Sequence, residues 1–303
     1  MTFKSRKQLL ISSVIILALI FNSTIISHKS TADWTMPNSD VDYILEESEW
    51  TVEYNDVTVS TNSGYYNGLM VKELGVFTVD VIDIDEQWGV DYNVDNSTHD
   101  VNDYITSDKF FFEFLKFLYY PLDESKHLVE TGLNETRVSM GFNILPWFFI
   151  ETSEETWNYL ANMSDINYHN LLPIVKNIEG SLRGDFVKAE SEATFDIMIQ
   201  GTVENSTLNI NYNFDHTLKF VWNALTGVLL GYRISSYFSG TYSGFTISEQ
   251  INVVCKQVGY ALEGFRFIAG FLPGYSFTIS LIGLTIIAIS FIVIKQLRRK
   301  REK

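Results

Sequence analysis

Strict alternation of apolar and polar residues marks the C-terminal third of the chain as β-sheet. From Val187 to Gln200 the odd positions are small or apolar and the even positions are mostly polar or charged. The segment from Leu208 to Trp222 alternates in the same way. A period of two over so many residues is typical of a strand with one buried and one solvated face. The pattern predicts two long antiparallel strands joined by a turn at residues 201–206.

The alternation continues beyond Trp222 and predicts two more strands. Residues 223–227 read as a turn, and a third strand follows from Val228 to Ile234. After Ser239 and Gly240 a fourth strand runs from Phe245 to Val253. Together these segments predict an antiparallel meander with one wet and one dry face. Strands of this length are expected to twist and curl strongly.

The N-terminal half carries shorter segments of the same kind. Strands are predicted from Trp50 to Ser60, from Val76 to Ile84 and from Val90 to Val94. The adjacent apolar residues Val81 and Ile82 break the alternation and indicate a β-bulge. No internal repeat or low-complexity linker divides these segments from the meander, which favours one continuous domain.

Two helices are predicted between the strands. Ser107 can cap a helix over residues 108–120, which Pro121 ends. Thr152 and Glu155 have the spacing of a capping box for a second, short helix. Such helices are suited to cover the dry face of a sheet. The predicted fold class is mainly β with a few helices (α+β): a long curled antiparallel sheet covered by helices, plus one C-terminal transmembrane helix.

The C-terminus has the pattern of a membrane anchor. Phe267 to Ile294 contains no charged residue, and six of the nine residues in 295–303 are Lys or Arg. Pro273 and Gly274 interrupt the run, and the 20 residues after them would span about 30 Å as a helix, the thickness of a bilayer core. Basic residues concentrate on the cytoplasmic side of a membrane span. The C-terminus is therefore predicted to be cytoplasmic.

The N-terminus resembles a secretory signal. Lys4, Arg6 and Lys7 precede an apolar run from Leu9 to Phe21, and small residues precede a cleavage position after Ala32. An uncleaved signal anchor fits the same residues and stays open. The predicted layout is 1–32 signal peptide or signal anchor, 33–266 extracellular β-rich domain, 267–274 interfacial linker with a sorting motif, 275–294 transmembrane helix and 295–303 basic cytoplasmic tail.

Charge and cysteine content fit an exported domain held by its core. Residues 33–273 hold 12 basic and 36 acidic side chains, a formal charge of −24. Such a domain avoids nucleic acid and anionic lipid headgroups. Cys255 is the only cysteine, so no internal disulfide can form.

Catalytic motifs are not found in the sequence, which contains no HExxH, GxSxG, GxxxxGK[ST] or GxGxxG. His216 falls on the apolar face of its predicted strand and is interpreted as a core histidine. A triad assembled from distant Ser, His and Asp residues stays open. The prediction is a domain without catalytic residues and not an enzyme.

The best metal candidate is Asp91-x-Asn93-x-Asp95, where alternate oxygen side chains could converge on Ca²⁺. The match to a calcium loop then fails, because Asn96 stands in place of Gly and Asn102 in place of Glu. A strand end with a polar solvent face explains the same residues, and both interpretations stay open. Four sequons predict N-glycosylation of an external domain, at Asn96, Asn134, Asn162 and Asn205.

A family resemblance rests on the tail and on one strand–turn–strand segment. Pro273, Gly274 and Tyr275, with the apolar span and basic tail, resemble the PGF-type sorting signals of archaeal surface proteins. Phe220 to Leu229 (FVWNALTGVL) resembles the F-x-Y-D-x-x-T-G-x-L pattern of archaeal choice-of-anchor families, most closely choice-of-anchor S. The resemblance implies a cell-surface location without an activity. Tyr replaces Phe in the signal and no Thr/Pro-rich stalk precedes it, so removal of the tail and retention as a helix both stay open.

Three functions are compatible with these features. The first is a non-enzymatic surface module that binds envelope proteins or glycans or has a structural role. The second is a carrier that holds a lipid or other apolar ligand in a half-barrel cavity. The third is a hydrolase on the secreted side with no recognisable motif. In each case membrane lipid is the predicted partner of the C-terminal helix.

Overall fold

The structure is a computed structural model, and it describes residues 40–66, 68–85, 89–94, 101–102, 124–145, 147–164, 178–207 and 209–266. The chain divides into two compact units, Met1–Phe267 and Ile268–Lys303. All described residues belong to the first unit. The predicted signal segment, the helix at residues 108–120, the sorting motif and the predicted span lie outside them. None of the helices in the described part of the chain is long and apolar enough to cross a membrane.

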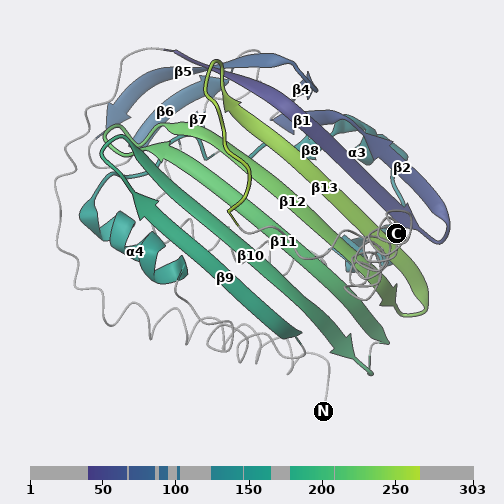
Figure 1. Cartoon of the computed structure of the whole chain (residues 1–303). Helices are drawn as coiled ribbons and strands as arrows, with labels where there is room; N and C mark the ends of the chain where they lie inside the picture. The colour runs from purple at the N-terminus through teal and green to yellow at the C-terminus, as the bar shows by residue number, and fades with distance from the viewer. Residues whose placement is uncertain are drawn as a thin grey trace, which may run out of the picture. The chain divides into compact units, whose positions relative to one another are not determined.

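A large antiparallel sheet dominates the described residues and confirms the mainly β prediction (Figure 1). Its strand order is β7-β6-β5-β1-β13-β12-β11-β10-β9, and β2 pairs with β1 beside this path. The strands are β1 (Val41–Tyr54), β2 (Val57–Thr61), β5 (Val76–Asp85), β6 (Gly89–Val94), β7 (Val101–Asn102), β9 (Ile178–Lys188), β10 (Glu192–Asn205), β11 (Ile210–Asn223), β12 (Leu229–Tyr242) and β13 (Phe245–Gln257).

A smaller sheet and helical segments accompany it. The small sheet has the order β4-β3-β8, with β3 (Ser63–Tyr66), β4 (Leu69–Lys72) and β8 (Phe142–Asn143). The helices are α3 (Glu135–Met140), α4 (Glu154–Ser164) and the helical residues 124–131.

The first and last strands of the described chain are neighbours in the middle of the large sheet. β1 pairs with β13 from Tyr43↔Gln257 to Tyr54↔Ile247, with a register shift between Leu45 and Glu47. The shift is a β-bulge, which inserts one extra residue and rotates the following side chains by one position. Before the bulge the odd-numbered residues Tyr43 and Leu45 face the core, and after it the even-numbered residues, such as Trp50, face the core.

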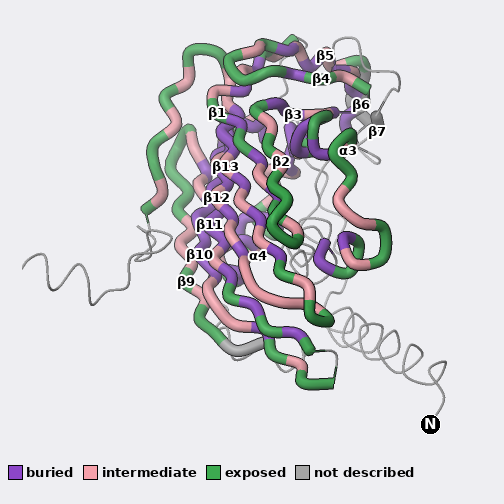
Figure 2. Tube along the Cα trace, turned by 90° about the vertical axis from the view of Figure 1, so that its right-hand side faces the viewer, coloured by how far each residue is buried: buried purple, intermediate pink, exposed green. Residues whose placement is uncertain are grey.

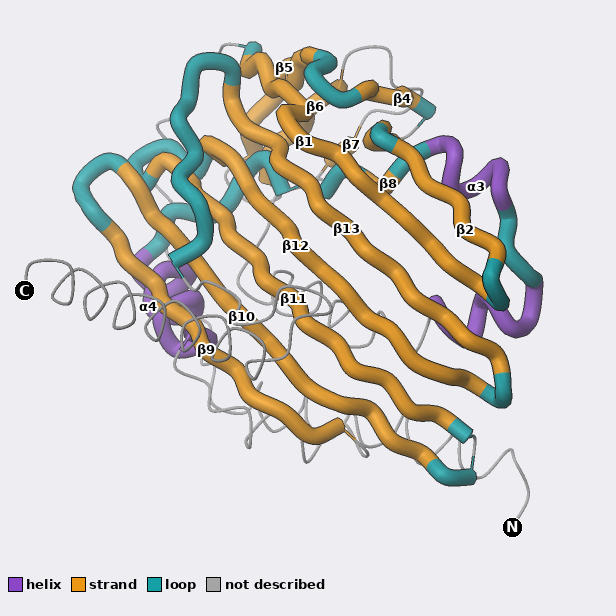
Figure 3. Tube along the Cα trace, turned by 45° about the vertical axis from the view of Figure 1, so that its right-hand side comes forward, coloured by secondary structure: helices purple, strands orange, loops and turns teal. Residues whose placement is uncertain are grey.

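The two faces of the sheet differ in composition and cover (Figures 2 and 3). The inner face carries buried apolar side chains, and α3 and α4 lie on its side. The opposite, outer face is crossed by the segment after β13, residues 258–266, which turns back over the sheet. Alternation along the strands thus separates a core-facing surface from a solvent-facing one, as the period of two predicts.

Among the described residues, α3 and α4 cover part of the inner face. The predicted helix over residues 108–120 lies outside them, so a sheet covered by helices stays a prediction. Residues 142–145 and 147–150 pack on the sheet between β1 and β12. Phe148 is fully buried, and its ring contacts the rings of Tyr43, Tyr66, Phe77 and Tyr92. Its backbone is fixed as well, because Leu229 N donates to Phe148 O at 2.7 Å. Residues 147–150, which we call the aromatic segment, can cover this face because their backbone groups form hydrogen bonds with residues at the β11–β12 turn.

α4 packs against β9 and β10 at the other end of the inner face. Trp157 and Leu160 are buried there. The cap differs from the predicted one. Ser153 lies before the helix, and its Oγ accepts a hydrogen bond from Thr156 N at 3.2 Å. Ser153 is thus the N-cap in place of the predicted pair Thr152 and Glu155.

Three strand boundaries predicted in the meander are wrong. The segment from Val187 to Gln200 contains the end of β9, a turn and most of β10. Val187 stands opposite Thr194 on the outer face, whereas Ala193 of β10 lies on the inner face. Odd-numbered residues therefore face outward in β9 and inward in β10, although the alternation in the sequence continues through the hairpin. The predicted turn at residues 201–206 is mostly β10. Likewise β12 continues past Ser239 and Gly240, and the real turn has positive φ at Ser243 and Gly244.

The predicted strand from Trp50 to Ser60 is a hairpin. β1 ends at Tyr54, and Asn55 and Asp56 adopt φ values of 48° and 66° before β2 begins. Two consecutive residues with positive φ are typical of the tight turns that match strand twist, and Asn and Asp tolerate this conformation best after Gly. By contrast, the predicted bulge near Val81 is confirmed by a register shift between Val81 and Asp83.

Gly227 is the residue where the aromatic segment meets the β11–β12 turn. Its φ is +71°, and a Cβ there would lie 2.0 Å from Ile150 O. We expect Gly227→Ala to destabilise the domain by about 2–4 kcal/mol, because backbone strain and a backbone collision add. Urea unfolding of the detergent-solubilised chain, followed by tryptophan fluorescence, measures this loss. Gly259→Ala is the control, since Gly259 has φ +85° with nothing within 4 Å of a Cβ. Equal losses for the two variants would contradict the predicted collision.

Candidate functional site

The outer face of the central strands is a network of polar side chains. Glu49 accepts a hydrogen bond from Asn252 Nδ2 (3.2 Å), and Glu53 accepts one from Ser248 Oγ (3.1 Å). Asn252 Oδ1 in turn accepts from Ser235 Oγ on β12 (3.0 Å). These contacts link β1, β13 and β12 through side chains. The surface they form is open to solvent and has more carboxylates than cations on β1.

An interruption in strand pairing lies at the edge of β1 beside this network. β5 pairs with residues 41–44 of β1, and β2 pairs with residues 50–54. Leu45 is bonded through its backbone to the β4–β5 turn. Residues 46–49 have no strand partner on this edge among the described residues. We call this interruption the β1 gap.

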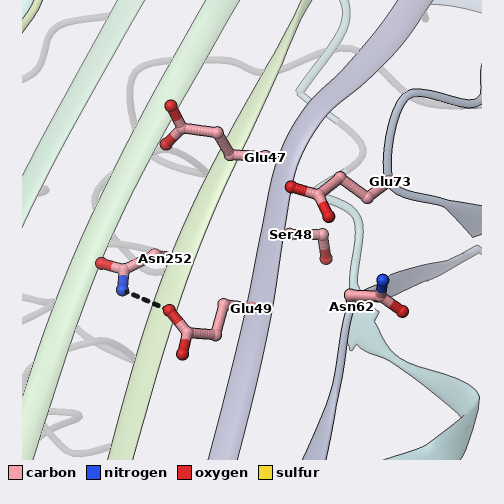
Figure 4. A pocket seen from close by; sticks show the side chains of 6 residues that line it. All are labelled: Glu47, Ser48, Glu49, Asn62, Glu73 and Asn252. Atoms are coloured by element: carbon pink, nitrogen blue, oxygen red, sulfur yellow. Dashed lines mark hydrogen bonds between the residues drawn. The ribbon is translucent and has the colours of Figure 1, made fainter.

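A pocket of about 400 Å³ opens at the β1 gap (Figure 4). β1 contributes three adjacent residues, the turn before β5 and the residue between β2 and β3 contribute one each, and β13 contributes one. In Figure 4 the Glu73 side chain extends toward β1, and the Ser48 hydroxyl points toward Asn62. The lining residues are Glu47, Ser48, Glu49, Asn62, Glu73 and Asn252.

Hydrogen-bond acceptors in this pocket exceed donors. Ser48 is 3% exposed, and its Oγ has no hydrogen-bond partner in the described part of the chain. Glu47 lies 3.5 Å from Arg233 in a partly exposed ion pair. Within the described ranges, no such cation or hydrogen-bond donor accompanies the Glu73 carboxylate. The pocket therefore combines an unpaired buried hydroxyl with an uncompensated carboxylate.

A second polar cluster fixes the segment 258–266 to the outer face. Asp196 and Lys219 form an ion pair (3.6 Å) with side-chain exposures of 0% and 3%. Lys219 Nζ also donates to Gly264 O at 2.8 Å, and Arg266 N donates to Asp196 Oδ2 at 2.9 Å. Burial raises the pKa of Asp196, whereas the bonds from Arg266 and Lys219 oppose that rise. The Arg266 side chain pairs with Asp185 on β9. The cluster is covered by the segment that it binds, so it has a structural role.

His216 lies fully buried on the inner face, as the sequence predicted for a core histidine. A hydrogen bond of 2.6 Å joins its Nδ1 to Ser236 Oγ on β12. Burial lowers the pKa of His216 from 6.5 to about 3, so the ring is neutral in the folded domain. Ser236 is 3% exposed. This Ser–His pair has the residue types of a nucleophile and base, but its burial keeps a substrate away from it.

A second buried polar contact on the inner face joins Glu249 of β13 to Trp50 of β1. Trp50 Nε1 donates to Glu249 Oε1 at 2.5 Å, and the Arg137 guanidinium lies 5.5 Å from the centre of the Trp50 ring. Arg137 also pairs with Glu124 at 2.7 Å. The contact between Trp50 and Glu249 was not predicted, because it joins positions nearly 200 residues apart in the sequence.

The predicted calcium ligands are only partly described. Asp91 and Asn93 lie in β6, where they stand opposite Asp83 and Asp80 of β5. Asp95 lies outside the described residues. Across the described ranges, no three His, Cys, Asp or Glu side chains are grouped closely enough to hold a metal ion. Calcium binding at Asp91, Asn93 and Asp95 stays a prediction.

Three of the four sequon asparagines are described. Asn134 caps α3, and its side chain accepts a hydrogen bond from Arg137 N at 3.0 Å. Asn162 is exposed on α4. Asn205 ends β10, where its Oδ1 accepts from Thr207 N at 3.0 Å. Asn96 lies outside the described residues, as do the anchor residues Pro273, Gly274 and Tyr275.

No protein-family model, curated protein or solved structure matches the chain. Function must therefore be argued from the two faces of the sheet and from the pocket at the β1 gap.

Proposed function

We propose that the chain is a membrane-anchored cell-surface protein whose β-rich domain is a non-enzymatic binding or structural module. The observation that carries this proposal is the contrast between the two faces of the sheet. The inner face is occupied by packed aromatic residues, whereas the outer face presents a solvated network of polar and carboxylate side chains. A broad polar surface on a rigid sheet is suited to contact another macromolecule.

The packing around Phe148 favours this function over a lipid carrier. A carrier needs an apolar cavity between the sheet and its cover. Four rings contact Phe148, and Trp147 packs near Phe220 with 4.7 Å between ring centres. The inner face is therefore packed with side chains around Phe148 and Trp147. The hydrolase alternative draws on His216 and Ser236, whose burial leaves no access for a substrate.

The proposed location rests on sequence. Residues 33–266 would face the outside, 275–294 would span the membrane, and 295–303 would be cytoplasmic. The choice-of-anchor resemblance supports an archaeal cell surface, with Pro273, Gly274 and Tyr275 as the sorting motif. Either removal of the tail or its retention as a helix is compatible with this location.

Cysteine labelling tests the topology, because the single native cysteine, Cys255, is not expected to react and only an introduced cysteine should be labelled. Cys255 is fully buried, and burial raises the pKa of its thiol to about 12, so it should not react with maleimides in the folded chain. Leu225→Cys places a thiol at a position that is 65% exposed. Lys300→Cys places one in the basic tail. We expect a membrane-impermeant maleimide to label Leu225→Cys on intact cells. A retained tail should be labelled at Lys300→Cys only after permeabilisation, whereas a removed tail leaves Lys300→Cys unlabelled in both conditions.

Two results would overturn this topology. Labelling of Lys300→Cys on intact cells would place the tail outside, and protection of Leu225→Cys until permeabilisation would place the domain inside. The unmodified chain should remain unlabelled until denatured. Mass spectrometry of the purified Leu225→Cys protein would also report cleavage after Ala32, loss of the tail, and glycans.

A further inference from the structure

We propose that the pocket at the β1 gap binds a primary ammonium group, as carried by a lysine side chain of a partner protein. The inference deepens the proposed function and rests on it, since it gives the surface module a ligand chemistry. It is carried by four observations about the same pocket: the interrupted strand pairing, the excess of carboxylates, the uncompensated Glu73 and the unpaired Ser48 hydroxyl.

The donor and acceptor balance of the pocket selects a cation that donates hydrogen bonds. Glu47, Glu49 and Glu73 offer acceptors only, whereas the amides of Asn62 and Asn252 offer both kinds. Asn252 already donates to Glu49. An ammonium group carries three donors and no acceptor, so it complements this lining. An anion would meet three carboxylates and would be repelled.

Ser48 gives the pocket a specific polar contact. A buried hydroxyl without a partner costs free energy, and native proteins satisfy nearly all such groups. Ser48 Oγ lines the pocket on the side of Asn62 and accepts no bond within the described residues. A bound N–H donor would satisfy it while it contacts the Glu73 carboxylate. We therefore assign direct contacts to Ser48, Asn62 and Glu73, with Glu47 and Glu49 adding negative potential across β1.

Other occupants fit the pocket less well. A metal ion needs several carboxylate or imidazole ligands at one point, and the described residues form no such group. An added β-strand needs a long free edge. The β1 gap is four residues long and is closed by β5 at one end and by β2 at the other. A single side chain that enters from solvent satisfies both limits.

The charge of the domain would assist such a ligand. Residues 33–273 carry a formal charge of −24, and fields of this kind raise the rate at which cationic partners associate. A pocket that takes one lysine is expected to be weak alone, with a dissociation constant on the order of 1 mM. In a partner protein the lysine would be one contact of a larger interface.

The binding test uses the full chain in neutral detergent. Nα-acetyl-lysine amide is the probe, and Nα-acetyl-norleucine amide is its matched control because it lacks the ammonium group. Calorimetric titration compares the unmodified chain with Glu73→Gln and Ser48→Ala. Glu53→Gln is the control variant, since Glu53 lies on the same strand and face as Glu49 but outside the pocket.

We expect the lysine probe to bind and the norleucine probe not to bind. Glu73→Gln should weaken lysine binding about tenfold and Ser48→Ala about threefold, as befits a charged and a neutral hydrogen bond. Glu53→Gln should change it less than twofold. Salt at about 0.5 M should weaken binding, because the carboxylates are solvated.

Several outcomes would overturn the proposal. Failure of the lysine probe to bind at about 50 mM, fifty times the expected dissociation constant, is one of them. Equal effects of Glu73→Gln and Glu53→Gln would indicate a general charge effect. Binding of Ca²⁺, lost in Glu73→Gln, without lysine binding would assign the pocket to a metal. Spermidine binding at least ten times tighter than the lysine probe would identify a free polyamine as the ligand and overturn the protein partner. None of these results alters the cysteine-labelling test, so the two proposals fail separately.

Discussion

Lowering the pH from about 6.5 to about 3 is expected to cost the domain about 4 kcal/mol of folding free energy through His216 alone. The folded ring has its pKa lowered to about 3 because it is fully buried, whereas the unfolded ring titrates near 6.5. At pH values between these two pKa values, His216 is protonated in the unfolded chain but stays neutral in the folded chain. The stability is therefore complete above about pH 6.5 and is lost progressively as the pH falls.

His216→Gln isolates this effect, because glutamine is neutral at every pH and can still bond to Ser236. Urea unfolding at about pH 7.5 and about pH 4 gives the loss for each chain. We expect the unmodified chain to lose about 3 kcal/mol more than the variant over this interval. Two aspartates act in the opposite sense. Burial raises the pKa of Asp196 and Asp215, so their protonation on acidification favours the folded state. Parallel losses in the two chains would refute the assignment to His216.

Lys219→Met is expected to destabilise the domain by about 3–5 kcal/mol, the usual cost of removing one partner of a buried ion pair. The variant leaves the Asp196 carboxylate at 0% exposure without its cation. It also removes the donor to Gly264 O, which fixes segment 258–266. Two measurements check this expectation: urea unfolding, and the rate of trypsin cleavage after Arg266, which should rise as the segment loosens.

The double variant Asp196→Asn with Lys219→Met supplies the control. Both charges are then absent, and the amide oxygen introduced at position 196 can still accept the bond from Arg266 N. The double variant should recover most of the stability that Lys219→Met alone loses, because an unpaired buried charge is costlier than a neutral pair. The single variant Asp196→Asn completes the comparison. If the losses of Asp196→Asn and Lys219→Met add up to the loss of the double variant, the two charges do not act as a pair and the explanation is wrong.

Period-two alternation located the meander because its inner positions are large and apolar. β10, β11 and β12 present Phe195, Phe220 and Ile234 to the core, and the solvent-facing positions between them are mostly polar. The turn at residues 223–227 was also predicted, since Thr226 and Gly227 combine a turn-forming residue with a positive φ. Long strands in a two-faced sheet are therefore well encoded in local sequence.

β9 was missed because glycines occupy two of its inward-facing positions, between and beside Leu182 and Phe186. A Cβ on Gly184 would lie 2.6 Å from Ser164 O at the end of α4, and one on Gly180 would lie 2.0 Å from Gln200 O. Close approach of neighbouring backbone thus requires glycine at these positions, and the alternation disappears from the sequence. The hairpin at Asn55 and Asp56 was missed for a different reason. Apolar and polar residues alternate on both sides of these two residues, so the sequence from Trp50 to Ser60 resembles one continuous strand.

The pocket at the β1 gap could not be predicted from sequence. Its residues come from β1, from two turns and from β13, and Glu47 and Asn252 are about 200 positions apart. Each is an ordinary surface residue in its own segment. Only the change of pairing partner along β1, from β5 to β2, brings them around one opening. His216, by contrast, could be placed in the core from its strand parity alone.

The pairing of β1 with β13 constrains how the protein can be made. The strand at the centre of the sheet acquires its main neighbour only after Gln257 has been synthesised, and closing so long a loop is slow. Until then the inner faces of β1 and β12 lack a shared partner. A nascent chain therefore cannot complete the centre of the sheet through most of translation, and a polypeptide that has not completed its fold is one that can be threaded across a membrane.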